Sequence, residues 1–238
     1  MTITSPTNKH LTEIRRLARA RARSESGRFV VEGEDLYAAA EAAGISPLYV
    51  LCAPGAAPGR GKRFVEVEPA LLRGVSALGS SSRLIAVYEQ RWSEASGPLC
   101  VALWGVRDPG NVGTVIRSAA SFGASAVALG AGCADPFGPK AVRASMGAIF
   151  ATPVARFASV AELPGRLVAL VPREGEPLVG DFEGTVTLLL GGEREGLPAE
   201  ILGACHELRH IPQQAGDSLN VAMAATVALY ETTRMAAP

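Results

Sequence analysis

The sequence lacks any apolar run close to the ~20 residues that a membrane-spanning helix needs. Its amino end is polar and then rich in arginine, without the apolar core of a signal peptide. We therefore expect a cytoplasmic protein with no membrane segment. Cysteine is also scarce, and no two cysteines form a CxxC pair, so we expect reduced thiols that fill the core. The cysteines are Cys52, Cys100, Cys133 and Cys205.

The chain also lacks any excess of charge, with 23 Lys and Arg against 23 Asp and Glu. An even spread of these charges would argue against a nucleic-acid partner, because phosphate binding draws on excess Lys and Arg. The spread is uneven, since the stretch from Lys9 to Arg28 is rich in arginine and holds only Glu13 and Glu25 as acids. The sequence therefore predicts a local basic patch near the amino end.

An amphipathic helix is predicted in this basic stretch. Apolar residues recur at helical spacing from Leu11 onward, and Arg15, Arg19 and Arg23 fall four apart on another face. Such an arginine stripe is either a solvated outer face or a surface that binds RNA. Periodicity alone does not separate the two interpretations.

Two domains are expected, because 238 residues exceed a typical single domain of ~100–200 residues. A polar stretch without periodicity over 90–98 suits a linker, so we predict a small α/β domain at 1–92 and a larger domain at 97–238. In the larger domain, apolar strands alternate with helices, which predicts a mostly parallel sheet covered on both faces. The expected strands are 99–104, 126–130, 167–171 and 186–190, and the expected helices are 111–122, 139–149 and 219–235.

The last of these helices is apolar almost all round between Val221 and Leu229. A helix with no wide polar face is either central in its domain or shared with a second subunit. We therefore predict a homodimer formed through this helix.

Three segments of the larger domain carry polar residues within apolar frames. The first runs from Arg107 to Arg117 at the mouth of a strand, and Arg117 lies off the apolar stripe of the helix that follows. The second is an apolar strand that ends in Gly191-Gly192-Glu193, where backbone can approach a ligand closely. The third places Ser218 and Asn220 at a helix start, where they either cap the helix or face a ligand. Each segment alone has an ordinary structural explanation.

Together, in this order and spacing, the three segments resemble the signature motifs of the SpoU branch of the SPOUT RNA methyltransferases. The resemblance covers about Leu99 to Glu231, and the residues before it resemble that family's substrate-binding domain. It implies an enzyme that uses S-adenosylmethionine to methylate a ribose 2′-hydroxyl in RNA. It also implies a trefoil-knotted parallel-sheet domain at the carboxyl end and a dimeric assembly; periodicity itself reveals no knot.

The resemblance also implies roles for particular residues. The catalytic or site-building positions are Asn111, Arg117, Glu193, Ser218 and Asn220, and the cofactor-binding positions are Gly191, Ile211 and Leu219. No metal is implied. The chain departs from the family pattern between Ile211 and Ser218, which are one residue closer than expected, and Gln213 stands where Met is common. The extended basic amino end favours 23S ribosomal RNA over transfer RNA as substrate, with Arg15, Arg19 and Arg23 as the RNA contacts.

The implied chemistry makes physical sense. Methyl transfer needs a nucleophilic oxygen held in line with the methyl group, so positioning can supply much of the rate enhancement. Because a guanidinium stays protonated in proteins, we expect Arg117 to orient the hydroxyl and an adjacent phosphate and to favour a developing alkoxide. A role for Arg117 as a literal base is left open.

Several rival interpretations stay open on the sequence. His206, Glu207 and His210 fit the HExxH pattern of zinc peptidases, although Pro212 disfavours the continuous helix that this motif needs. Gly130-Ala131-Gly132 follows a strand as in dinucleotide-binding enzymes, but Asp135 replaces the third glycine. A transfer RNA methyltransferase and a catalytically dead RNA-binding homologue also stay open.

Overall fold

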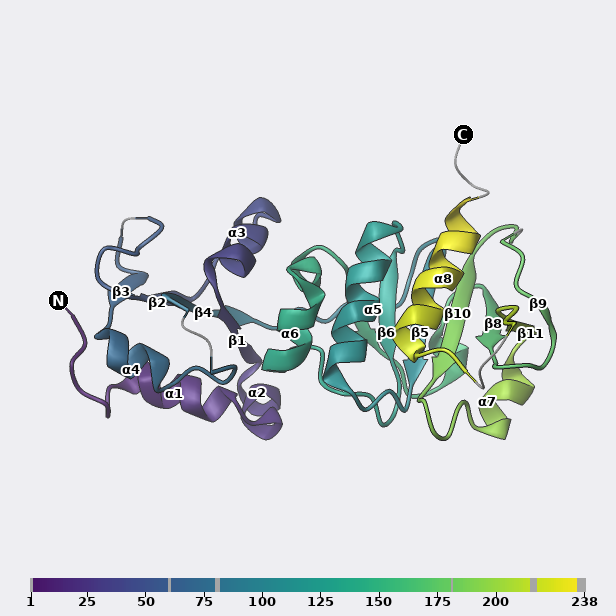
Figure 1. Ribbon diagram of the computed structural model, residues 1–238, viewed down its shortest axis with the longest axis horizontal. Helices are drawn as coiled ribbons and strands as arrows, with labels where there is room; N and C mark the ends of the chain where they lie inside the picture. The colour runs from purple at the N-terminus through teal and green to yellow at the C-terminus, as the bar shows by residue number, and fades with distance from the viewer. Residues whose placement is uncertain (1, 60, 80–81, 181, 215–217, 235–238) are drawn as a thin grey trace. The chain divides into compact units, whose positions relative to one another are not determined.

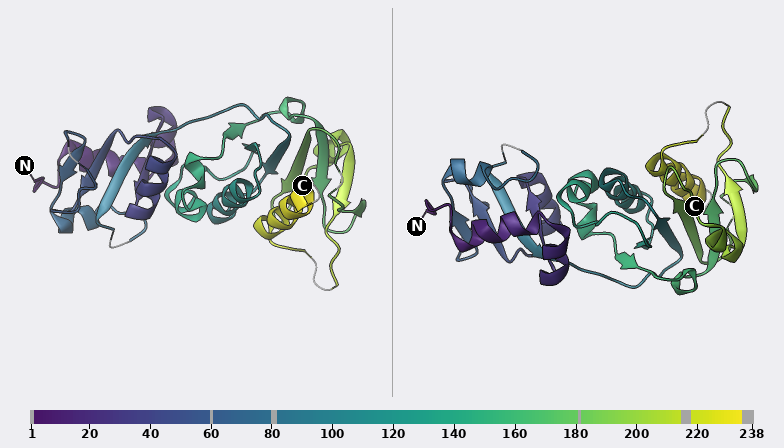
Figure 2. Two further views of the ribbon diagram at one scale, coloured as in Figure 1. Left: turned by 90° about the horizontal axis from the view of Figure 1, so that it is seen from above. Right: turned by 90° about the horizontal axis from the view of Figure 1, so that it is seen from below.

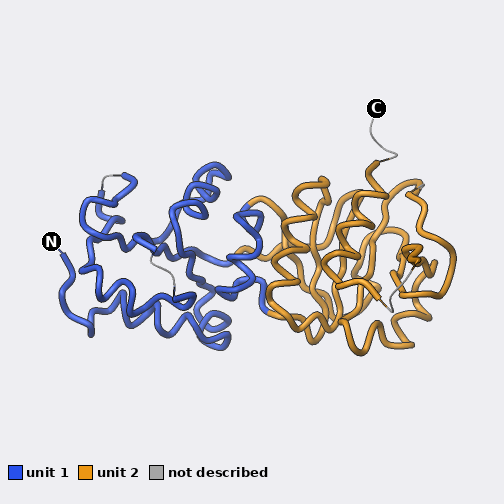
Figure 3. The backbone as a smooth tube through the Cα atoms, viewed as in Figure 1, with its two compact units in different colours: residues 1–90, 135–150 blue, residues 91–134, 151–238 orange. Residues whose placement is uncertain are grey.

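The computed structural model describes residues 2–59, 61–79, 82–180, 182–214 and 218–234. The chain forms two compact units, one of residues 1–90 and 135–150, the other of residues 91–134 and 151–238 (Figure 3). The chain first passes from one unit to the other after Gln90, in the polar stretch where the sequence suggested a linker. Residues 135–150, however, belong to the amino-terminal unit and not to the larger domain in which the sequence placed them.

The amino-terminal unit is built on a four-stranded sheet in the order β1-β4-β2-β3. β4 runs antiparallel to β1 and β2, and β3 is parallel to β2. The strands are β1 (Arg28–Glu32), β2 (Tyr49–Cys52), β3 (Phe64–Glu66) and β4 (Leu84–Glu89). The helices are α1 (Lys9–Leu17), α2 (Ala20–Ser26), α3 (Glu34–Ala42), α4 (Pro69–Arg73) and α6 (Pro139–Ser145).

Aromatic packing explains why residues 135–150 belong to this unit. Phe137 lies 5.0 Å from the ring of Phe29, and Phe150 lies 5.0 Å from the ring of Tyr88, measured between ring centroids. Phe29 is on β1 and Tyr88 is on β4, so both strands bury their aromatic side chains against the 135–150 segment. Pairs of this kind add to the free energy gained from burial alone. The α6 helix ends earlier than predicted because Met146 adopts a left-handed conformation with φ of 50°.

The predicted arginine stripe is wrong, because the basic stretch forms two helices and not one. α1 ends at Leu17 and α2 begins at Ala20, with Arg19 in an extended conformation between them. Arg15 and Arg19 are exposed, but Arg23 is only 5% exposed. These three side chains therefore share no common face.

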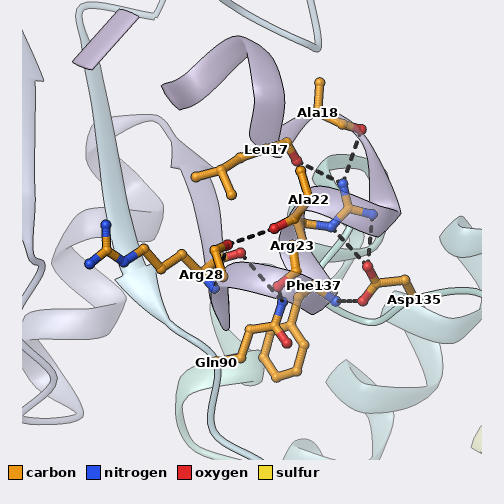
Figure 4. Close-up of polar contacts among 9 residues, drawn as sticks. Leu17, Ala18, Ala22, Arg23, Arg28, Gln90, Asp135 and Phe137 are labelled. Carbon is orange, nitrogen blue, oxygen red and sulfur yellow. Dashed lines mark hydrogen bonds and ion pairs between the residues drawn. The ribbon is translucent and has the colours of Figure 1, made fainter. Parts of the chain in front are cut away.

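The Arg23 side chain points inward and binds backbone carbonyl groups at the break between the two helices (Figure 4). Its guanidinium donates to the carbonyl oxygens of Leu17 at 2.8 Å and Ala18 at 3.0 Å, which lie at the end of α1. It also forms an ion pair with Asp135 at 2.7 Å. The terminal carbonyls of a helix need partners from outside the helix, and Arg23 supplies them. Arg23 is thus a structural residue and not an exposed contact for RNA.

The second unit contains a seven-stranded sheet in the order β7-β6-β5-β10-β8-β11-β9, and every neighbouring pair is parallel. The predicted parallel sheet is therefore confirmed. Its strands are β5 (Leu99–Trp104), β6 (Ala126–Leu129), β7 (Val154–Arg156), β8 (Arg166–Leu170), β9 (Glu176–Pro177), β10 (Val186–Gly191) and β11 (Glu207–His210). Its α-helices are α5 (Pro109–Ser121), α7 (Ala199–Ala204) and α8 (Val221–Arg234).

The strand order brings distant segments together at the carboxyl edge of the sheet. β5 and β10 are central neighbours although they are far apart in the sequence, and their last paired residues are Trp104 and Gly191. α8 packs against α5 and β10, with the Ser118 and Thr226 hydroxyls 2.6 Å apart between the two helices (Figures 1 and 2). Ligands of open parallel sheets bind at this edge, where neighbouring strands diverge in their connections.

α8 has a buried face and an exposed apolar face. Ala225, Ala228 and Leu229 are fully buried, whereas Met223 is 62% exposed and Tyr230 is 52% exposed. Its own unit therefore covers only part of the apolar surface that the sequence gives this helix. None of the described helices is both long and apolar enough to cross a membrane.

Candidate functional site at the carboxyl edge of the parallel sheet

The first polar segment is fixed at the start of α5. Asp108 caps the helix, since its carboxylate accepts a hydrogen bond of 2.9 Å from the backbone N–H of Asn111. Pro109 occupies the first turn, where its missing N–H costs nothing. This local structure holds the Asn111 side chain at the end of β5, beside the loop that follows β10.

Asn111 joins all three polar segments. Its side-chain amide donates a hydrogen bond to Glu193, in the loop after β10. Its side-chain oxygen accepts a hydrogen bond of 3.2 Å from the side chain of Asn220, just before α8. Because an ionised carboxylate only accepts hydrogen bonds, the contact with Glu193 determines which end of the Asn111 amide is the nitrogen.

Asn220 caps the last helix, as one of the two sequence-based interpretations expected, and its side chain also contacts Asn111. Its side-chain oxygen accepts a hydrogen bond of 2.9 Å from the backbone N–H of Ala222, which caps α8. Its side-chain nitrogen simultaneously donates to Asn111. The cap thus orients the amide so that its donor end faces the other two polar segments.

A cavity of about 440 Å³ lies beside this network. Apolar side chains of Leu170, Leu190, Leu197 and Val221 form part of its wall. Five residues predicted as site residues also line it, namely Gly191, Glu193, Ile211, Ser218 and Leu219. The structure therefore brings together every predicted cofactor-binding residue and two of the predicted catalytic residues.

A second cavity, of about 710 Å³, lies at the ends of β5, β6 and β10. It is lined by Trp104, Arg107 and Asp108 on one side and by Gly132 from the loop after β6 on another. Residues 192–196 line both cavities. Trp104 and Arg107 were not predicted as site residues from the sequence. Their place beside this cavity depends on which strand ends lie side by side in the sheet.

The loop between the two cavities is tightly closed. The backbone N–H of Gly192 donates to the carbonyl oxygen of Trp104 at 2.8 Å, and that of Gly196 donates to Gly192 at 2.9 Å. A Cβ atom on Gly191 would lie 2.2 Å from the backbone carbon of Gly196, so this position requires glycine. The loop holds Glu193 at the boundary that both cavities share.

The remaining predicted site residues lie elsewhere. Arg117 is exposed on α5, and among the described residues its guanidinium makes no hydrogen bond or ion pair and lines neither cavity. Arg15, Arg19 and Arg23 belong to the amino-terminal unit. Of the segment from Gln213 to Asp217, where the family pattern is broken, residues 215–217 lie outside the described part of the chain.

The zinc-peptidase alternative is wrong on geometry. Glu207 and His210 lie on strand β11, whereas the HExxH motif needs both histidines on one helix. His206 accepts a hydrogen bond of 3.0 Å from the backbone N–H of Leu167, and Glu207 forms ion pairs with Arg166 and Arg209. The dinucleotide-binding alternative also fails, because a loop follows Gly132 and the next helix begins only at Pro139.

The cysteines near the sheet are poor nucleophiles. Burial raises the pKa of Cys100 to about 11, and burial also raises the pKa of Cys133 above its ordinary value. A thiol attacks as its thiolate, so neither residue is ionised to a useful extent at neutral pH. Chemistry through a covalent cysteine intermediate is therefore disfavoured here.

Comparison with known proteins assigns the family. The model of the SpoU rRNA Methylase family matches residues 98–230. An uncharacterized tRNA/rRNA methyltransferase of Mycobacterium tuberculosis is 39% identical over 56% of this chain and 50% of its own length, so the chain spans about half of that relative. A 23S rRNA (uridine-2′-O)-methyltransferase of Streptomyces viridochromogenes is 36% identical over 53% of this chain and 49% of its own length.

Solved structures agree along the whole chain. The crystal structure of an AdoMet-bound rRNA methyltransferase from Sinorhizobium meliloti superposes with a TM-score of 0.87 at 31% identity, covering 100% of this chain and 99% of that one. The AdoMet complex of the SpoU methyltransferase AviRb from Streptomyces viridochromogenes has a TM-score of 0.80 at 27% identity, covering 96% and 98%. The family match, with the fold and the three joined polar segments, shows that this chain belongs to the SpoU rRNA methylase family.

Proposed function

We propose that this protein transfers the methyl group of S-adenosylmethionine to a ribose 2′-hydroxyl of RNA. The observation that carries the proposal is the junction of Glu193, Asn111 and Asn220 beside two cavities that share one loop. A methyl transferase for a macromolecule needs room for a small methyl donor and for a nucleotide side by side. The two cavities supply that room at the edge where parallel sheets bind ligands.

The smaller cavity suits S-adenosylmethionine. Its volume of about 440 Å³ lies in the ordinary range of small-molecule sites. The leucine side chains in its wall fit an adenine ring, and Glu193 can pair with a positively charged group of the cofactor. Gly191, Ile211 and Leu219 are the residues that would hold the cofactor, largely through their backbone. When bound, S-adenosylmethionine supplies an electrophilic methyl group on a positively charged sulfur.

The residues of the chain then have to position the ribose. Asn111, Ser218 and Asn220 carry neutral donors and acceptors that can hold ribose hydroxyls. Arg117 would orient the reacting hydroxyl and a phosphate through its planar fork and favour the developing negative charge on oxygen. During transfer the ribose oxygen bonds to the methyl carbon, the bond from that carbon to sulfur breaks, and the hydroxyl proton passes to solvent water. A protonated guanidinium cannot accept this proton, so we assign Arg117 an orienting and electrostatic role.

23S ribosomal RNA is the substrate that we propose over transfer RNA. Among the relatives, one is named a 23S rRNA (uridine-2′-O)-methyltransferase and another, from Xylella fastidiosa, a 23S rRNA (guanosine-2′-O-)-methyltransferase. We further propose that the amino-terminal unit binds the RNA through its exposed arginines Arg15 and Arg19. Neutral net charge does not oppose this role, because the stretch from Lys9 to Arg28 is locally basic and holds only Glu13 and Glu25 as acids.

A homodimer through α8 remains part of the proposal. Met223, Val227 and Tyr230 form an exposed apolar face on that helix. A second copy of the chain would bury this face by the symmetry that most homo-oligomers use.

We also propose that the chain after β10 is knotted and that the protein acts in the cytoplasm. The knot rests on the resemblance to the SpoU family, and the packing of α8 on α5 and β10 is compatible with it.

Transfer of a labelled methyl group tests the proposal directly. The purified protein would be incubated with methyl-labelled S-adenosylmethionine and ribosomal RNA from cells that lack the gene, followed by alkaline hydrolysis. A 2′-O-methyl group blocks hydrolysis of the adjacent phosphodiester, so the label is expected in alkali-resistant dinucleotides. Label in mononucleotides would indicate base methylation, and binding of RNA without label transfer would indicate a catalytically dead homologue.

A further inference from the structure

Trp104 ends β5 and lines the larger cavity. The Phe157 ring packs against the Trp104 ring, with the two ring centroids 5.8 Å apart and an interplanar angle of 48°. A Cβ atom on Gly130 would lie 2.4 Å from the Trp104 ring, so only glycine there leaves room for the indole. The ring is therefore held in one place, and it is only half-buried.

The position of Trp104 is tied to the proposed reacting centre. Its carbonyl oxygen accepts the hydrogen bond from the backbone N–H of Gly192, the residue before Glu193. Arg107 lines the same cavity, and its ion pair with Glu195 spans 3.2 Å with both side chains more than 70% exposed. An exposed pair of this kind contributes little stability, so a phosphate can displace the Glu195 carboxylate at small cost. The cavity thus joins an aromatic ring, an available cation and the loop of Glu193.

Proteins that recognise particular RNA sequences mostly bind single-stranded loops, bulges and ends, where bases are splayed out and lack a stacking partner. Aromatic side chains commonly take over this stacking in proteins that bind single-stranded nucleic acid. We propose that Trp104 is the platform on which a base of the substrate RNA stacks while its ribose lies at Glu193 and Asn111. This inference rests on the proposed function and names a substrate-binding residue for it.

Fluorescence of Trp104 gives a test that does not depend on catalysis. Trp92→Phe leaves Trp104 as the sole tryptophan, since the chain has two. Titration with single-stranded 12-nucleotide RNA of random sequence, in the presence of S-adenosylhomocysteine, should quench this fluorescence in parallel with binding measured by anisotropy of the labelled RNA. Binding by anisotropy with unchanged Trp104 fluorescence would overturn the proposal.

Kinetics of matched variants give the second test. Trp104→Phe should keep kcat/KM for ribosomal RNA within about 3-fold, whereas Trp104→Leu should lose about 10- to 100-fold, the scale of one stacked base. Affinity for S-adenosylmethionine should stay within 2-fold in both, because Trp104 does not line the smaller cavity. Equal kcat/KM for the Phe and Leu variants would show a core residue only. If the wild-type protein transfers no methyl group at all, the proposed function fails, and the fluorescence result still decides the role of Trp104.

Discussion

The side-chain amide of Asn111 donates a hydrogen bond to Glu193 and so joins the first turn of α5 to the loop after β10. The same amide accepts a hydrogen bond from Asn220, at the amino end of α8. Glu193 and Asn220 are 82 and 109 residues away from Asn111 in the sequence, so three distant segments share one polar junction. The junction lies beside the cavity that we assign to the methyl donor.

Asn111→Ala should lower the rate of methyl transfer by about 10- to 100-fold, because it removes a positioned hydrogen-bonding group at the reacting centre. Affinity for S-adenosylmethionine should hardly change, since Asn111 does not line the smaller cavity. Thr114→Ala is a matched control on the same helix. In the part of the chain that the structure describes, the Thr114 hydroxyl bonds only to the carbonyl oxygen of Gly110, at 2.8 Å. Single-turnover rates near wild type for Asn111→Ala would remove this residue from the site.

Arg117→Ala should keep the fold and cofactor binding but lose methyl transfer by a factor of ~100 or more, the scale of one deleted donor to a transition state. The side chain is exposed, so its removal leaves the core intact. Arg117→Lys should rescue poorly, because lysine keeps the charge and loses the planar fork. Arg117 is six residues beyond Asn111 in the sequence, which places it roughly 9 Å farther along α5. If Arg117→Ala kept most of the single-turnover activity, Arg117 would be a solvated surface residue with no part in the reaction.

Arg23→Ala should lower the free energy of unfolding by about 3 kcal/mol, because it leaves a partly buried carboxylate and two carbonyls at the end of α1 without their partner. Asp135, Leu17 and Ala18 are the groups affected. Arg21→Ala provides the control, since Arg21 is 90% exposed and pairs with Glu25 on the surface. Urea denaturation measures both, and a decrease smaller than about 0.5 kcal/mol for Arg23→Ala would match an ordinary surface pair.

Arg15→Gln combined with Arg19→Gln should weaken RNA binding and lower the slope of log K against log salt by up to about 1.4, or ~0.7 for each phosphate of a single strand that the variant no longer neutralises. The affinity for S-adenosylmethionine should stay the same. Filter binding at several salt concentrations measures the slope. Unchanged RNA affinity across that range would show that Arg15 and Arg19 are only solvated surface residues.

Met223→Glu combined with Tyr230→Glu should convert a dimer into a folded monomer, because both side chains are exposed on α8. Light scattering reports the mass and thermal denaturation reports the fold. Leu48→Glu places the same charge on another exposed apolar position, in the amino-terminal unit, and should leave the dimer intact. A wild-type protein that is monomeric at micromolar concentration would contradict the dimer.

Much of the fold could be predicted from the sequence, because strands such as β5 and β10 are continuous apolar runs that a parallel sheet buries on both faces. The sequence did not predict that residues 135–150 belong to the amino-terminal unit. Their helical pattern shows which residues are buried, but not that Phe137 and Phe150 pack on Phe29 and Tyr88. Periodicity is local, and the choice of sheet is made by tertiary contacts.

For the candidate site too, the sequence predicted some features and missed those that depend on tertiary contacts. Asn111, Glu193 and Asn220 stand out in the sequence as polar residues within apolar frames, and the structure joins them. The arginine stripe failed because its spacing assumed one continuous helix, whereas Asp135, 112 residues away, holds Arg23 inward. The place of Trp104 depends on which strand ends lie side by side, and the sequence pattern does not state strand order.

Ribose methylation mapped across total RNA tests the central claim most directly. RNA would be compared from cells with the gene, cells without it, and deleted cells that carry either the wild-type gene or the Arg117→Ala variant. We expect one 2′-O-methylated nucleotide, or a small group of them, in 23S ribosomal RNA to disappear with the gene and to return with the wild type but not with the variant. Identical ribose-methylation maps in all four RNAs would contradict the proposed function.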